Sequence, residues 1–212
     1  MQKITFYTKE SYSVKNNALE LVEKLNFNYA QKKHVLNLKK AALLTIDAQN
    51  YFFNAASTAF IASSPQIITS IKQLQNFFLA NNILCLQTKH IDDANGKMQN
   101  WWGRSILDDE IVSSLQNTGI TIIKKRSYDA FWQTSLKNIL KAHGITQIII
   151  VGVCTHLCCE TTARAAFIQG FDVFIVLDAV CAHNKNINNN SIINLAHGFV
   201  APILLSDIYA KK

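Results

Sequence analysis

Six short apolar runs, rich in β-branched residues, constrain the fold of this chain most strongly. Runs that stay apolar at nearly every position are typical of parallel strands covered on both faces. Segments with helical periodicity lie between them, which predicts right-handed βαβ units. We therefore expect an α/β, Rossmann-like fold of three layers, with a doubly wound, mostly parallel six-stranded sheet and helices on both faces. The expected strands are residues 41–46, 83–88, 119–124, 147–152, 172–177 and 201–206.

The length of 212 residues suits one α/β domain. We expect this domain to span residues 39–212 and residues 1–38 to form a helical, lysine-rich N-terminal extension. Residues 1–40 hold eight lysines and three glutamates, and so carry most of the formal net charge of +7. A basic face can bind nucleic acid, but the chain has only three arginines and they are scattered. We therefore do not expect a nucleic-acid partner.

The lengths of the apolar segments also indicate the cellular compartment. No run reaches the roughly 18 residues of a membrane span, and the N-terminus has no apolar signal core. We expect a cytoplasmic protein with no membrane partner. Its five cysteines, an odd number, do not suggest a disulfide framework in that compartment.

Polar residues at the carboxyl ends of the expected strands are the candidates for a site, because ligands of such sheets bind at that edge. Asp47 follows the first strand, Lys125 the third, and Cys154 to Cys158 the fourth. Each has an ordinary alternative: a turn cap for the aspartate, an exposed lysine after a strand, and small apolar cysteines that fill a tight turn. Together they suggest an aspartate that takes a thiol proton and a lysine that lowers the pKa of a cysteine.

Three cysteines gather in the stretch VGVCTHLCCETTARAAF. A structural zinc site is disfavoured because no second ligand pair exists, and no C-x-x-C redox motif is present. The cysteines lie where a strand meets the start of a helix, and the backbone N–H groups there can stabilise a thiolate and an oxyanion. Helical geometry by itself does not decide between Cys158 and Cys159 as the nucleophile.

Three motifs in order, ALLTIDAQNYFF, KKRSYDAF and GVCTHLCCETTARAAF, resemble those of the isochorismatase-like hydrolases. This family, also called the cysteine hydrolase superfamily, includes nicotinamidases and N-carbamoylsarcosine amidase. The resemblance covers about residues 38–206 and implies that Asp47, Lys125 and Cys158 are catalytic. It also implies a cis peptide before Cys154 and an oxyanion hole formed by the backbone N–H groups of Cys154 and Cys158.

The chain departs from the nicotinamidase pattern after the second strand. An Asp-x-His motif binds a metal in those relatives, whereas this chain has Thr88-Lys89-His90. We therefore expect no metal and no cofactor. A cysteine at position 158 favours hydrolysis of an amide or ureido C–N bond through a thioester. The alternatives are an isochorismatase-type vinyl-ether hydrolase that releases pyruvate, and a non-catalytic binding protein that uses the basic N-terminus.

The sequence says little about the substrate beyond a small molecule. The loop after the second strand, which includes Arg104, could line or cover the pocket, and aromatic residues near position 130 could form an apolar wall. The resemblance implies a homo-oligomer, a dimer or a tetramer. The predicted pocket residues are Gln49, Phe52, His90, Trp101, Trp102, Tyr128, Phe131 and Thr155.

Overall fold

One six-stranded sheet forms the centre of the computed structural model, which describes residues 9–26, 35–93, 96–106 and 110–210. Neighbouring strands are all parallel, in the order β3-β2-β1-β4-β5-β6. The sheet therefore has its topological switch between β1 and β4. The strands are β1 (Ala41–Ile46), β2 (Cys85–His90), β3 (Thr121–Lys125), β4 (Gln147–Val153), β5 (Asp172–Cys181) and β6 (Ala201–Ile203).

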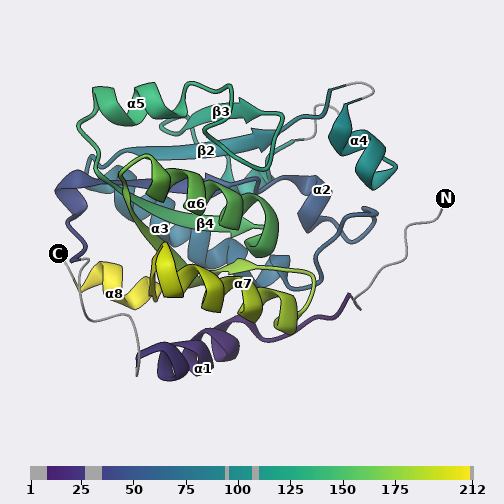
Figure 1. Ribbon diagram of the computed structural model, residues 1–212, viewed down its shortest axis with the longest axis horizontal. Coiled ribbons are helices and arrows are strands. Elements are labelled where there is room, and N and C mark those ends of the chain that lie inside the picture. Colours follow the sequence, from purple (N-terminus) through teal and green to yellow (C-terminus); the bar gives the residue numbers. More distant parts are fainter. Residues whose placement is uncertain (1–8, 27–34, 94–95, 107–109, 211–212) are drawn as a thin grey trace.

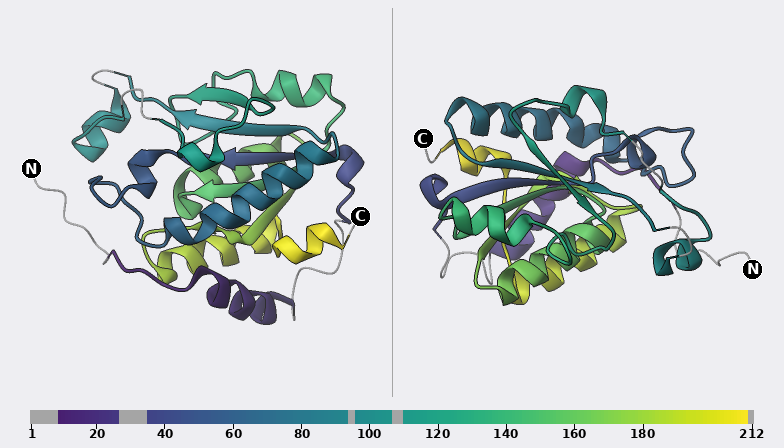
Figure 2. Two further views of the ribbon diagram at one scale, coloured as in Figure 1. Left: turned by 180° about the vertical axis from the view of Figure 1, so that it is seen from behind. Right: turned by 90° about the horizontal axis from the view of Figure 1, so that it is seen from above.

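Helices cover both faces of this sheet (Figure 1). On one face lie α5 (Leu136–Ala142), α6 (Glu160–Ile168) and α7 (Lys185–Gly198), whose buried residues form one core cluster with the sheet. On the other lie α3 (Ile68–Ala80) and α8 (Leu205–Tyr209), which contribute to a second cluster. Figure 2 shows the sheet between the two helical layers. The expected three-layer α/β fold is confirmed.

The short helices α2 (Asn50–Phe53) and α4 (Lys97–Trp102) follow the carboxyl ends of β1 and β2. In Figure 1 they lie at the end of the molecule toward which the strand arrows point. These elements and the loops around them therefore border the edge of the sheet where a site was expected.

The predicted strand bounds are correct at β1, and β4 is one residue longer than predicted, whereas β2 and β3 each begin two residues later than predicted. β5 continues to Cys181, and β6 ends at Ile203 because α8 begins soon afterwards. The backbone N–H of Leu204 donates to the Asp207 carboxylate at 2.8 Å, which caps that helix. Gly144 and Gly170 follow the C-terminal ends of α5 and α6 with positive φ angles, the conformation in which many helices end.

The lysine-rich N-terminal segment forms a helix, α1 (Val14–Asn26). Its buried face, with Ala18, Leu21 and Leu25, belongs to the core and packs against β5 and α7. Before this helix, the backbone N–H of Glu10 donates to the carbonyl of His183 at 3.0 Å. The described part of the segment thus lies directly on the sheet and its helices. None of the described helices is long and apolar enough to cross a membrane.

Candidate active site

Strands β1 and β4 approach each other closely at the edge where the candidate residues lie. Gly152 adopts a φ of +111°, and a Cβ there would lie 2.1 Å from the carbonyl oxygen of Ile46. Only glycine permits this approach. Asp47, with a φ of +46°, comes next on one strand, and the Val153–Cys154 peptide, which is cis as the resemblance implied, comes next on the other. The segments that follow β1 and β4 therefore leave the sheet side by side.

Cys158 lies in a π-helical turn, Thr155–Cys159, that joins β4 to α6. Thr155, Cys158 and Cys159 of this turn are buried, and the Cys158 side chain contacts Lys125 at the end of β3. π-Helical turns recur at functional sites. The neighbouring Cys159 is fully buried in the core cluster under α6. The fold thus separates two adjacent cysteines that the sequence could not separate by periodicity.

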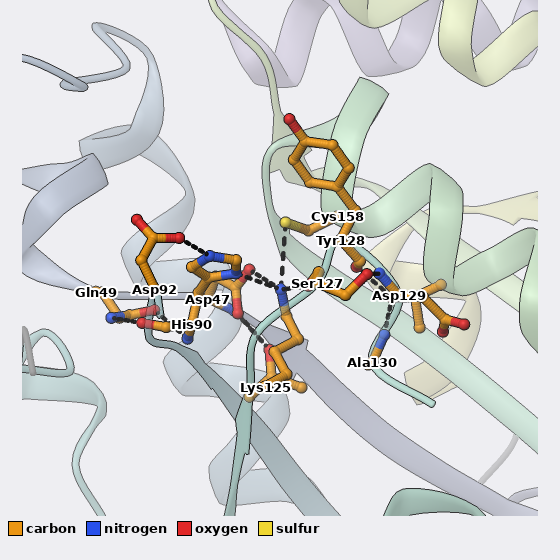
Figure 3. A network of polar contacts seen from close by, with 12 residues as sticks. Asp47, Gln49, His90, Asp92, Lys125, Ser127, Tyr128, Asp129, Ala130 and Cys158 are labelled. Carbon is orange, nitrogen blue, oxygen red and sulfur yellow. Dashed lines mark hydrogen bonds and ion pairs between the residues drawn. The ribbon is translucent and has the colours of Figure 1, made fainter. Parts of the chain in front are cut away.

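The ammonium of Lys125 brings the three predicted residues together. Lys125 ends β3, and its Nζ lies 2.7 Å from Oδ2 of Asp47 and 3.3 Å from Sγ of Cys158. It also donates to the carbonyl of Ser127 at 2.9 Å and lies 3.2 Å from Nδ1 of His90. Figure 3 shows this ammonium at the centre of the network. The predicted convergence of Asp47, Lys125 and Cys158 is therefore present in the fold.

Burial and charge set the protonation of this group. Burial opposes the ionisation of Asp47, but Lys125 and His90 outweigh it and hold the pKa of the carboxyl below its usual value. Burial also disfavours charge on Lys125, yet Asp47 and Cys158 raise the pKa of that ammonium. The pair is thus a carboxylate and an ammonium, fully buried together.

The cysteine behaves differently from our expectation. Burial raises the pKa of the Cys158 thiol well above its usual value; Lys125 opposes this shift, and Asp47 adds to it. Lys125 thus acts in the expected direction, but the low cysteine pKa that we expected as the net result is wrong. The physical reason is that desolvation of a thiolate outweighs one nearby cation whose charge the carboxylate already balances.

Thr88 fixes the aspartate. Its hydroxyl donates to Oδ1 of Asp47 at 2.6 Å and accepts from the Asp47 backbone N–H at 3.0 Å. Sequence reasoning noted Thr88 only as a missing metal ligand and assigned it no role. The signal that could have revealed this role is the position of Thr88 on β2, the strand next to β1. Thr45 of β1 pairs with Gln87 of β2, so Thr88 lies beside the end of β1, where Asp47 follows.

His90 is held between two charged residues. Nδ1 of His90 lies 3.2 Å from the ammonium of Lys125, and its Nε2 lies 2.8 Å from Oδ1 of Asp92. The other oxygen of Asp92 accepts from the backbone N–H of Ile106 at 2.6 Å. Asp92 therefore ties the loop after β2 to the site, a role that the sequence did not reveal.

The same contacts test whether a metal fits. Possible ligand atoms of Asp47, His90 and Cys158 lie within 4.8 Å of one another. The ammonium of Lys125 contacts all three, however, and so takes the position that a cation would need. Both ring nitrogens of His90 also already have partners. The described residues of this cluster do not fit a metal ion.

A cavity of about 60 Å³ opens next to Cys158. One water needs roughly 15 Å³ on this measure, so the cavity has room for a small molecule. Four predicted pocket residues line it: Phe52, His90, Trp102 and Tyr128. The Trp102 indole N–H donates to the Tyr128 hydroxyl at 2.8 Å, which joins two of these walls. The other lining residues are Tyr51, Ala59, Asp92, Met98, Arg104, Ile106, Cys154, Leu157, Cys158 and His183.

Four other predicted pocket residues lie elsewhere. The side chain of Gln49 is buried and binds the backbone N–H and carbonyl of His90 at 2.7 and 3.0 Å. Trp101 is 64% exposed and borders a separate outer hollow. Phe131 stacks on Phe171 in the core, and Thr155 donates to the side chain of Asn188 at 2.8 Å. Each of these side chains contacts the protein scaffold or solvent instead of the cavity.

Comparisons with known proteins show which family the chain belongs to. The chain is 33% identical to nicotinamidase 3 of Arabidopsis thaliana over 182 residues, which are 81% of this chain and 88% of that protein. It is 30% identical to enterobactin synthase component B of Escherichia coli K12, over 70% of this chain and 55% of that protein.

Solved structures share the fold. A cysteine hydrolase from Pseudomonas syringae pv. phaseolicola matches 84% of this chain and 95% of its own with a TM-score of 0.79 at 21% identity. An N-carbamoylsarcosine amidase from Thermoplasma acidophilum matches 78% of this chain and 96% of its own with a TM-score of 0.72 at 20% identity. The family described as "Isochorismatase domain" matches residues 41–207. The chain therefore belongs to the isochorismatase-domain family of hydrolases.

Proposed function

We propose that this protein is a cysteine-dependent hydrolase that cleaves the C–N bond of a small amide or ureide through a thioester. The observation that carries the proposal is the contact of Lys125 with both Asp47, at 2.7 Å, and Cys158, at 3.3 Å, beside a small cavity. A thiol, a carboxylate and a balancing ammonium are the groups that acyl transfer by a cysteine requires.

The first half-reaction uses the carboxylate as a base. Asp47 takes the proton from the Cys158 thiol as Sγ attacks the substrate carbonyl carbon, and the C–N bond breaks as Asp47 passes that proton to the leaving nitrogen. Lys125 stays protonated and balances whichever anion is present. Proton transfer during the attack suits this thiol. Because burial raises its pKa, the thiolate forms only as Sγ attacks.

The second half-reaction reverses these roles. Water attacks the thioester carbon, Asp47 takes the proton of that water, and Sγ leaves and is protonated again. The products are ammonia or an amine and a carboxylic or carbamic acid. In this proposal the backbone N–H groups of Cys154 and Cys158 hold the oxyanion in both halves.

The names of two similar proteins, a nicotinamidase and an N-carbamoylsarcosine amidase, support amide or ureide chemistry. A second candidate is the hydrolysis of a vinyl ether with release of pyruvate. The observation in its favour is the 29% identity to an isochorismatase of Bacillus subtilis over 151 residues, which are 66% of this chain and 48% of that protein. That reaction needs no covalent step, so the two candidates differ in their need for the Cys158 sulfur.

A release assay separates the candidates. Ammonia is measured with a panel of small amides and ureides, and pyruvate is measured with isochorismate. We expect the Cys158→Ala variant to lose ammonia release and the matched Cys159→Ala variant to keep it, with an acyl adduct on Cys158 in mass spectra of the quenched reaction. Pyruvate release that survives Cys158→Ser would favour the vinyl-ether reaction. Ammonia release that survives Cys158→Ala would contradict the thioester.

A further inference from the structure

Two cations meet at the outer part of the cavity. Arg104, which lines the cavity, donates from its guanidinium to the backbone carbonyl of Thr58 at 2.9 Å. The ammonium of Lys9 donates to the same oxygen, also at 2.9 Å. The cationic nitrogens therefore lie within two hydrogen-bond lengths of each other. Figure 1 shows the segments involved, the start of the described N-terminal chain, the loop after α2 and the chain after α4, at one end of the molecule.

Nothing negative balances this pair in the part of the chain that the structure describes. No carboxylate there forms an ion pair with Lys9 or Arg104. The guanidinium also lies over the ring of Tyr51, 6.0 Å from its centroid. Partial burial and the charge of Arg104 both lower the pKa of Lys9, which agrees with two like charges held together. Such an arrangement costs free energy until an anion joins it.

The acidic side chain on the cavity wall does not supply that anion. Asp92 is engaged by His90 and by the backbone N–H of Ile106, on the side of the cavity nearest Lys125. The lining also includes the apolar side chains of Phe52, Met98 and Leu157. The cavity wall therefore combines the Cys158 thiol, apolar side chains and the cation of Arg104.

We infer that Arg104 and Lys9 bind a carboxylate of the substrate, so that the substrate is a small amide or ureide that carries a carboxylate in addition to the bond that breaks. This inference rests on the proposed function for the identity of the reacting group. A guanidinium matches the planar fork of a carboxylate, and the small cavity favours that group over a bulkier phosphate. It also gives the N-terminal segment a role, since Lys9 comes from that segment.

Matched substrates test the inference. The full-length protein is assayed with N-carbamoyl amino acids of increasing size, with their neutral methyl esters and with N-carbamoyl aminophosphonates of the same length. We expect kcat/KM to favour the free carboxylate over its ester. The Arg104→Gln variant should reduce that preference roughly 10- to 100-fold, mainly through KM, because it removes a charged hydrogen bond. The Lys9→Gln variant should reduce it less, and preference for the phosphonate would overturn the assignment to a carboxylate.

Arg126 offers the matched control. It is exposed and paired with Asp93 away from the cavity lining, so Arg126→Gln should leave the carboxylate preference unchanged. Equal losses for acid and ester in Arg104→Gln, or in Arg126→Gln, would show a general effect and overturn the inference.

A binding measurement distinguishes failure of this inference from failure of the proposed function. Quenching of Trp102 fluorescence is followed with benzoate and with benzamide, in the unchanged protein and in Arg104→Gln. Benzoate binding that is lost in the variant supports the carboxylate site even if no C–N bond is cleaved. Amide hydrolysis without any carboxylate preference, and no Arg104-dependent benzoate binding, would leave the proposed function standing and overturn the inference.

Discussion

The floor and the rim of the cavity are built in different ways. The floor is the buried cluster of Asp47, Thr88, His90, Lys125 and Cys158 at the strand ends and in the turn after β4; of these, His90 and Cys158 line the cavity. The rim comprises Lys9, Tyr51, Trp102, Arg104 and Tyr128, which come from loops, short helices and the N-terminal segment and are partly exposed. The sheet dictates the floor, whereas segments distant in the sequence assemble the rim. Our two proposals thus place the chemistry in the floor and the choice of substrate in the rim.

The largest effect should follow a change that pushes the floor apart. A Cβ at position 152 meets backbone atoms of Ile46, so Gly152→Ala should lower the free energy of unfolding by more than about 4 kcal/mol or prevent folding. Gly170→Ala is the control, because φ is also positive there but no atom lies near the added Cβ; about 1–3 kcal/mol is expected. Urea denaturation measures both, and similar values for the two variants would refute the idea that close approach at Gly152 sets the floor.

The next effect concerns the buried ion pair. Asp47→Asn or Lys125→Met leaves one buried charge without its partner, and each should lower the free energy of unfolding by about 3–5 kcal/mol. The double variant should be more stable than either single variant, since no unpaired charge remains. All three should lose at least about 100-fold in kcat, because the base or its counter-ion is gone.

Urea midpoints and ammonia release together check this separation of stability from chemistry. If the double variant were less stable than both single variants, the pair would not be coupled as the distances suggest. If it kept full activity, Asp47 would not be the base.

A smaller effect depends on pH. Burial lowers the pKa of His156, in the turn with Cys158, and of His183, on the cavity wall, to about 4. In the unfolded chain both titrate near 6.5. Between these values the unfolded state binds more protons, so stability falls as the pH drops from about 6.5 toward 4, by at most about 1.4 kcal/mol per pH unit for each histidine.

Denaturation curves from pH 7.5 to 5 measure this slope. Burial raises the pKa of Asp129 and Asp178, which acts in the opposite direction, so the His156→Gln variant is compared with the unchanged protein at each pH. The variant should show a flatter slope. An identical slope would mean that His156 does not titrate with unfolding.

The smallest effects should come from the rim. Tyr128→Phe removes the acceptor of the Trp102 hydrogen bond and should lower the free energy of unfolding by about 1 kcal/mol or less. Trp101→Ala, on the exposed outer side, should change it by less than about 0.5 kcal/mol. Thermal or urea midpoints check both. A loss in Tyr128→Phe as large as that of the ion-pair variants would abolish the distinction between floor and rim.

The sequence alone determined the fold class, the approximate positions of the strands and three of the floor residues, Asp47, Lys125 and Cys158. Near-continuous apolar runs report burial on both faces, and parallel strands bring their carboxyl ends to one edge, so Asp47, Lys125 and Cys158 were predictable from their places after the strands. Motif resemblance chose Cys158 over Cys159 and anticipated the cis peptide that the structure contains. The oligomeric state and the oxyanion hole stay predictions.

Only the tertiary structure decided how these residues are charged and what surrounds them. Desolvation depends on burial in three dimensions, which is why the pKa of Cys158 is raised where local reasoning expected it to be lowered. The role of Thr88, the exposure of Trp101 and the meeting of Lys9 with Arg104 depend on contacts between distant segments. No periodicity or spacing along the chain records such contacts, because side-chain packing between loops follows from the completed fold.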